Sequence, residues 1–114
     1  MAMSENTVSY TTNPTEPLNI VQVGGGDTLD EYAMRHVLPL NPTEVRYHYE
    51  DGGYDGRGAM LLKVNDLWYY HDLGHCSCNG PTEFISLRQG YSSLEELLLS
   101  CSEELRNELL PLIP

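Results

Sequence analysis

Residues 44–71 constrain the fold more than any other part of the chain. In the first part of this segment, residues 44–50, apolar or aromatic residues alternate strictly with charged or polar ones. Val45, Tyr47 and Tyr49 fall on one side of that run, with charged or polar residues between them. An apolar residue at every second position is the pattern of a strand with one buried face. The run therefore predicts a half-buried strand.

Two further strand-like runs follow directly. Within residues 58–64, positions 59–62 and 64 are apolar, and consecutive apolar residues are typical of a central strand that is covered on both faces. Residues 67–71 are mainly aromatic, and aromatic side chains favour cross-strand packing. The pair Asn65-Asp66 between these runs suits a tight two-residue hairpin. We therefore expect three successive antiparallel strands, which is a meander.

The C-terminal residues 94–112 predict one long helix. Ser92 or Ser93 can cap its start, and Ser93 and Glu96 have the spacing of a capping box. Its apolar residues recur at helical spacing, which indicates packing on the sheet. They are Leu94, Leu97, Leu98, Cys101, Leu105, Leu109 and Leu112.

A shorter helix is expected from Asp27 or Thr28 up to the residue before Pro39, because proline disfavours the helical conformation of its predecessor. Thr28 and Glu31 again have capping-box spacing. The side chains expected on the buried face are Leu29, Tyr32, Ala33, His36 and Val37. His36 is interpreted as a histidine at the edge of the core.

The remaining segments complete the predicted fold. Residues 18–23 favour a short strand, and residues 83–88 favour a last edge strand. Residues 1–17 are rich in Ser, Thr, Asn and Pro, which indicates a flexible arm. We therefore predict one α+β domain over residues 18–114. It would be a three- to four-stranded antiparallel meander packed against a C-terminal helix and a shorter N-terminal helix.

Side chains that could carry chemistry are concentrated in residues 71–81. His71, His75, Cys76 and Cys78 supply four potential zinc ligands within eight residues, and zinc binds imidazole nitrogen and thiolate sulfur. Structural zinc sites usually pair cysteines that are further apart in the sequence than Cys76 and Cys78. The alternative is an ordered loop without metal that packs against the aromatic strand.

Cysteine chemistry is a second alternative for the same segment. A thiol nucleophile needs a neighbouring base and an orienting third group. Cys76 or Cys78 with a nearby histidine and Asp72 would supply those residue types for a hydrolase or redox protein. Neighbours this close in sequence rarely converge on one substrate atom, so we do not assign a catalytic residue.

Residues 68–81 resemble a segment of small uncharacterised proteins from bacteriophages and prophage-bearing bacteria. In those proteins a tyrosine-rich strand also runs into His-Cys-Ser-Cys, one further residue and Gly-Pro. The chain departs from the pattern at Asn79, where the family has an aromatic residue. The resemblance implies a phage-type origin and no assigned activity.

The charge of the chain restricts its partners. It has 17 acidic and 6 basic residues, for a net charge of −11, which repels nucleic-acid backbones and anionic membranes and attracts basic surfaces. Residues 1–17 lack the apolar core of a signal peptide, so we expect a cytoplasmic protein. Because the sequence offers no convincing set of catalytic residues, we also expect the protein to be non-enzymatic. We expect it to bind and occlude a basic site on a host protein, as an inhibitor of a defence system would. The candidate contact residues are Glu95, Glu96, Glu103, Glu104 and Glu108.

Overall fold

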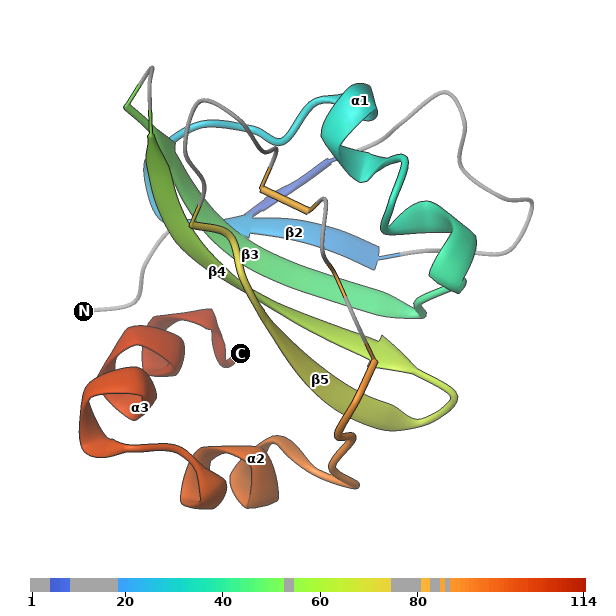
Figure 1. Cartoon of the computed structure of the whole chain (residues 1–114), viewed down its shortest axis with the longest axis vertical. Coiled ribbons are helices and arrows are strands. Elements are labelled where there is room, and N and C mark those ends of the chain that lie inside the picture. The colour runs from blue at the N-terminus through green and yellow to red at the C-terminus, as the bar shows by residue number, and fades with distance from the viewer. Residues whose placement is uncertain (1–4, 9–18, 53–54, 75–80, 83–84, 86) are drawn as a thin grey trace.

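The computed structural model describes residues 5–8, 19–52, 55–74, 81–82, 85 and 87–114. These residues form a five-stranded sheet whose strands lie side by side in sequence order (Figure 1). The strands are β1 (Glu5–Thr7), β2 (Asn19–Val23), β3 (Glu44–Asp51), β4 (Gly56–Val64) and β5 (Leu67–Asp72). The helices are α1 (Glu31–Met34), α2 (Leu94–Ser100) and α3 (Glu103–Leu109), with 3-10 turns η1 (Leu38–Leu40) and η2 (Leu110–Leu112). The mixture of a sheet and helices confirms the α+β class.

The sheet is mixed, so the prediction of a purely antiparallel meander is wrong in this respect. β2 pairs with β3 in parallel, and Ile20 lies opposite Val45 in that pair. Parallel neighbours need a crossover connection between them. Residues 24–43 supply it and carry α1 and η1. Periodicity reports which face of a strand is buried but not the direction of its neighbour, which is why this pairing was not predicted.

The meander of β3, β4 and β5 is confirmed. β4 pairs antiparallel with both neighbours. Asn65 and Asp66 have φ values of 52° and 66°, as a type I′ hairpin requires. Met60 and Leu62 belong to the core on one face of the sheet, and Leu61 belongs to the core on the other. β4 is therefore the central, doubly covered strand that its apolar sequence predicted.

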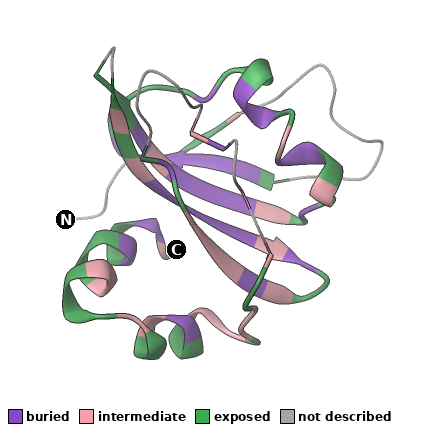
Figure 2. Ribbon diagram, viewed as in Figure 1, coloured by how far each residue is buried: buried purple, intermediate pink, exposed green. Residues whose placement is uncertain are grey.

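Helices cover both faces of the sheet. α1 and η1 lie on one side, and α2, α3 and η2 lie on the other (Figure 1). Residues on the sheet-facing sides are buried, whereas much of the outer surface of α2 and α3 is exposed (Figure 2). Two apolar cores result, one on each face of the sheet.

The second face of β3 is also covered, which the half-buried prediction did not anticipate. Arg46 lies on this face and is only 3% exposed. Its Nε donates a hydrogen bond to the carbonyl oxygen of Leu112 in η2. Its Nη2 lies 2.9 Å from Oε1 of Glu5 in β1, an ion pair without a well-aligned hydrogen bond. Arg46 therefore joins the sheet to both ends of the described chain.

The predicted long C-terminal helix is instead α2 and α3, which are separated at Cys101 and Ser102. Ser93 accepts a hydrogen bond from the backbone of Glu96, and so caps α2 as predicted. Ser102 accepts one from the backbone of Leu105 and caps α3. The second cap restarts the helix because a serine hydroxyl satisfies an amide that a continuous helix would bond to a carbonyl. The apolar stripe is confirmed, since its residues pack on the sheet through both helices.

The N-terminal helix is shorter than predicted. It begins after Asp30, whose carboxylate accepts a hydrogen bond from the backbone of Ala33 at 2.8 Å. Thr28 does not cap it, because its hydroxyl donates to the side chain of Gln22 in β2 at 2.8 Å. Tyr32 was expected on the buried face but is 70% exposed, and Met34 is buried in its place. The chain is helical for only about one turn here, so a single helical face does not extend over residues 29–37.

The two ends of the sheet differ from expectation. Within the predicted arm, Glu5–Thr7 pairs with β2 as a strand, while residues 1–4 and 9–17 lie outside the described residues. Of the predicted edge strand 83–88, the described residues are not in a strand. Ile85 and Leu87 instead pack on the core that α1 also covers. Among the described residues, the outer side of β5 pairs instead with Tyr91 alone.

Candidate functional site

His71 is the one predicted zinc ligand that falls within the described residues. It lies on β5, opposite Met60 of β4. Its Nε2 is 2.9 Å from the carbonyl oxygen of Pro81, and because a carbonyl can only accept, Nε2 carries the proton. Burial lowers the pKa of His71, against the opposing effects of the Pro81 hydrogen bond and the charge of Asp72. In this arrangement only Nδ1 of the neutral imidazole is free to act as a ligand.

The other predicted ligands, His75, Cys76 and Cys78, lie outside the described residues. Within the part of the chain that is described, no three His, Cys, Asp or Glu side chains gather closely enough to hold a metal ion. The zinc site and the cysteine nucleophile therefore both stay predictions. The third cysteine, Cys101, is half-buried at the junction of α2 and α3, and its thiol donates to the carbonyl of Leu97.

The five predicted contact glutamates form what we call the acidic helical face. Glu95 and Glu96 lie in the first turn of α2, and Glu103 and Glu104 lie in the first turn of α3. Carboxylates are stabilised there by the partial positive charge of a helix N-terminus. All five, including Glu108, are exposed. Because the chain restarts its helix at Ser102, it presents two such acidic first turns instead of one.

The acidic helical face has no ion-pair partner among the described residues. Arg106 is the basic residue of α3, but its guanidinium donates to the backbone carbonyls of Leu98 and Cys101 at 3.0 and 3.2 Å. It thereby fastens α3 to the end of α2. Glu96 accepts a hydrogen bond from the hydroxyl of Ser92 at 2.8 Å, and that contact is uncharged on the serine side. The negative charge of this surface is therefore available to a partner.

A second acidic region surrounds a cavity of about 370 Å³ beside α1. Asp27, Asp30 and Asp51 line it together with Tyr49. Asp27 accepts a hydrogen bond from the backbone of Asp51 at 2.8 Å. The pKa of Tyr49 is raised to about 12, mainly by burial and to a lesser extent by the carboxylates of Asp51, Asp27 and Asp30, in that order of effect. The sequence did not indicate this cavity, because its residues come from a loop, a helix and a strand that are far apart in the chain.

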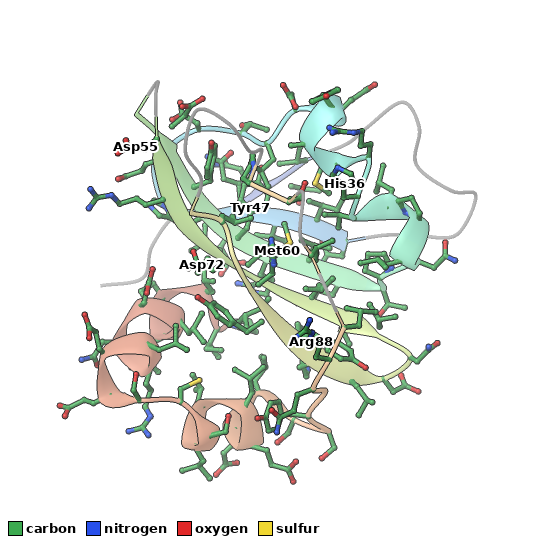
Figure 3. All side chains as sticks on the ribbon, viewed as in Figure 1. His36, Tyr47, Asp55, Met60, Asp72 and Arg88 are labelled. Carbon is green, nitrogen blue, oxygen red and sulfur yellow. The ribbon has the colours of Figure 1, made fainter. Side chains whose placement is uncertain are left out.

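His36 lies at the wall of the same cavity, beneath α1 (Figure 3). Its position at the edge of the core agrees with the sequence interpretation. Its Nε2, however, is buried and has no hydrogen-bond partner in the described part of the chain. A buried polar atom without a partner costs free energy. The structure gives no compensating contact for it within the described residues.

A groove of about 380 Å³ lies between the outer edge of β5 and the junction of α2 and α3. We call it the edge groove. Tyr69, Tyr70 and Tyr91 line one part of it, and Cys101 and Leu105 line another. The pKa of the Tyr70 hydroxyl is raised to about 12. Burial is the largest cause, and the charges of Asp72, Glu108 and Cys101 contribute the rest. The aromatic run that predicted β5 thus also supplies the wall of a groove.

Comparisons of the chain with models of protein families, with curated proteins and with solved structures find no match. Among the described helices, none combines the length and the apolar composition that a membrane crossing requires. The site residues are therefore interpreted from their geometry and charge alone.

Proposed function

We propose that this protein acts by binding, and that the acidic helical face docks on a basic surface of another protein. The observation that carries the proposal is the set of five exposed glutamates without an ion-pair partner among the described residues. A partner with complementary charge would gain attraction there without first breaking an existing ion pair. Such complementarity contributes mainly to specificity and to the rate of association.

The distribution of the basic residues supports the same proposal. Arg46 is buried against Glu5, and Arg106 is occupied by backbone carbonyls. The guanidinium of Arg35 lies 3.5 Å from the centre of the Tyr32 ring. These three cations are held by their own surroundings and do not neutralise the five glutamates of the acidic helical face, and the whole chain carries a net charge of −11. A protein that binds with such a face covers the basic groove or patch it occupies.

The proposed setting is the cytoplasm of a bacterial host. The resemblance of residues 68–81 to phage and prophage proteins motivates it, and an accessory protein of this kind would occlude a basic functional site of a host protein. Proteins that handle nucleic acids carry such sites, because they bind phosphates. An inhibitor of a nucleic-acid-handling defence complex is the specific form of the proposal.

The test compares two variants of equal charge. Glu95→Gln with Glu104→Gln removes two charges from the acidic helical face, and Asp55→Asn with Asp66→Asn removes two exposed charges elsewhere. Glutamine avoids placing a lysine at a helix N-terminus, and asparagine tolerates the positive φ at position 66. Each lost contact is expected to cost about 0.2–1 kcal/mol. Binding of the captured host protein should therefore weaken by about 2- to 30-fold for the first variant only.

The measurement is capture from host lysate at low and high salt, followed by affinity determination with the captured protein. Binding should weaken as salt rises, and the first variant should show a flatter salt dependence. Equal weakening by the two variants would show that the acidic helical face is not the contact. No capture at either salt, together with turnover that depends on Cys76 or Cys78, would replace the binding proposal by an enzymatic one.

A further inference from the structure

The outer edge of β5 offers unpaired backbone groups for another strand. Successive residues of a strand direct their N–H and C=O groups to alternate sides. Trp68 directs both groups outward, since its N–H donates to Tyr91 at 2.7 Å and its carbonyl accepts from Tyr91 at 2.9 Å. By this alternation Tyr70 and Asp72 also point outward, whereas Tyr69 and His71 bond to β4.

No described residue pairs with the outward backbone groups of Tyr70 or Asp72. The chain leaves the edge immediately before Tyr91. A Cβ atom at Gly90 would lie 2.8 Å from the ring of Tyr69, so the chain can pass this ring only as glycine. The Trp68–Tyr91 bridge therefore shows that this edge accepts a strand, and the described part of the chain pairs with the edge at Trp68 alone.

The edge groove lies where the next strand would run. Its lining combines Tyr69, Tyr70 and Tyr91 with Ser100 and Leu105 of the helical junction. Tyr69 and Tyr70 are adjacent in β5 and point to opposite faces of the sheet. Their shared presence in the lining means that the groove surrounds the edge of the strand. Its volume of about 380 Å³ falls within the range of ligand-binding cavities.

We propose that the edge groove binds an extended, lysine- or arginine-containing peptide segment, which adds to the sheet as a further strand beyond β5. Strand addition of this kind obtains affinity from backbone hydrogen bonds and specificity from alternate side chains. The basic character of the peptide rests on the proposed function, because both follow from the same excess of negative charge. The strand addition itself rests on the geometry of β5.

The chemistry of the groove favours cationic side chains. Tyrosine faces attract ammonium and guanidinium groups. Asp72 and Glu108 lie close enough to Tyr70 for their charges to raise its pKa, so they would also attract a cation placed beside it. Arg88 belongs to the lining and lies beside β5 (Figure 3). Its charge directs the cations of the peptide toward the end of the groove that is near Asp72 and Glu108.

The probe is a capped octapeptide of alternating lysine and valine. Amide hydrogen exchange of the full chain is followed by NMR without and with this peptide. The amides of Tyr70 and Asp72 should exchange rapidly in the free protein and slow by about fivefold or more at saturation, the factor that corresponds to the net stabilisation of one hydrogen bond. The amides of Tyr69 and His71 serve as internal controls, because they are already bonded to β4 and should exchange slowly in both states.

Matched controls in the peptide and in the protein separate the effect of backbone pairing from the effect of charge. The same peptide with alternate N-methylated amides cannot pair as a strand, and a glutamate–valine peptide reverses its charge. In the protein, Asp72→Pro removes the outward N–H, which an edge strand can tolerate, whereas Asp72→Asn removes only the charge. The proposal expects Asp72→Pro and N-methylation to abolish the protection of Tyr70, and Asp72→Asn to retain part of it.

The outcomes separate this inference from the proposed function. Protection of Tyr70 and Asp72 before any peptide is added would overturn the inference, as would equal protection by the glutamate–valine peptide. If the lysine–valine peptide perturbs only the acidic helical face, strand addition is wrong and the proposed function stands. If the edge amides are protected while Glu95→Gln with Glu104→Gln leaves capture of the host protein unchanged, the edge groove is a binding site and the acidic helical face is not.

Discussion

Replacing Arg46 by methionine should destabilise the domain more than any exposed charge change. Arg46→Met keeps a long side chain on the covered face of β3 but removes the guanidinium. Three contacts disappear with it: the hydrogen bond to the Leu112 carbonyl, the ion pair with Glu5 at 2.9 Å and the more distant one with Glu44 at 3.8 Å. The variant therefore lacks the polar contacts through which η2 and β1 are joined to β3.

The magnitude follows from how far each partner is exposed. The Glu5 side chain is 45% exposed, so solvent replaces most of that ion pair, which contributes at most about 1 kcal/mol. The bond to Leu112 is buried and charge-assisted, and such bonds contribute about 1.5–3 kcal/mol. We expect Arg46→Met to lower the free energy of unfolding by about 1.5–4 kcal/mol. Glu5→Gln, which keeps the buried bond, should lower it by no more than about 1 kcal/mol.

Urea denaturation of the two variants and the native chain measures these differences by linear extrapolation. Hydrogen exchange adds a local readout, since Arg46→Met should speed exchange in η2 and β1 more than in β4 and β5. A loss below about 0.5 kcal/mol for Arg46→Met, the range of ordinary surface changes, would refute the reasoning. An equal loss for Glu5→Gln would show that the ion pair, and not the buried hydrogen bond, carries the stability.

Two further predictions concern acid stability and backbone packing. Burial holds the pKa of His71 below its ordinary value of 6.5, so the unfolded chain binds more protons between the two values, and stability should fall as pH decreases below about 6.5. His71→Gln should flatten this decline in urea denaturation from pH 8 to 5, and an unchanged slope would contradict the assignment. Gly58→Ala should cost about 1–3 kcal/mol, because its Cβ would lie 2.2 Å from the His48 carbonyl oxygen. Gly25→Ala, with nothing within 4 Å of its Cβ, is the control, and equal thermal stability of the two variants would count against the close approach.

Local sequence determined the elements whose structure depends on near neighbours. The alternation around Tyr47 produced β3, because a period of two places one face of a strand in the core. Asn65 and Asp66 produced the hairpin between β4 and β5, because they adopt positive φ at low cost. The stripe that includes Leu97 and Leu109 determined which side of the C-terminal helices is buried. These features need only a few consecutive residues and no knowledge of the rest of the chain.

The break between α2 and α3 also has a local signal in the sequence. The leucine stripe is the more prominent pattern, and it led to the prediction of one continuous helix. Ser102, followed by Glu103 and Glu104, is an N-cap signal. The leucine stripe continues through it at helical spacing, and a continuous helix satisfied that spacing equally well. The competition was settled by the Ser102 cap and by Arg106, whose bonds to Leu98 and Cys101 hold the two helices together across the break.

Only the tertiary structure decided the remaining features, because they join residues that are distant in sequence. The parallel pairing of β2 and β3 is a choice of direction, and side-chain periodicity is the same for both directions. Arg46 is buried because η2, 66 positions further along the chain, supplies an acceptor for it. The edge groove exists because the chain reaches the edge of β5 at Tyr91, opposite Trp68, and the residues before Tyr91 do not pair with Tyr70, which leaves this position open to another strand within the described structure. Long-range contacts of this kind depend on how separate elements pack, and no single stretch of sequence contains that information.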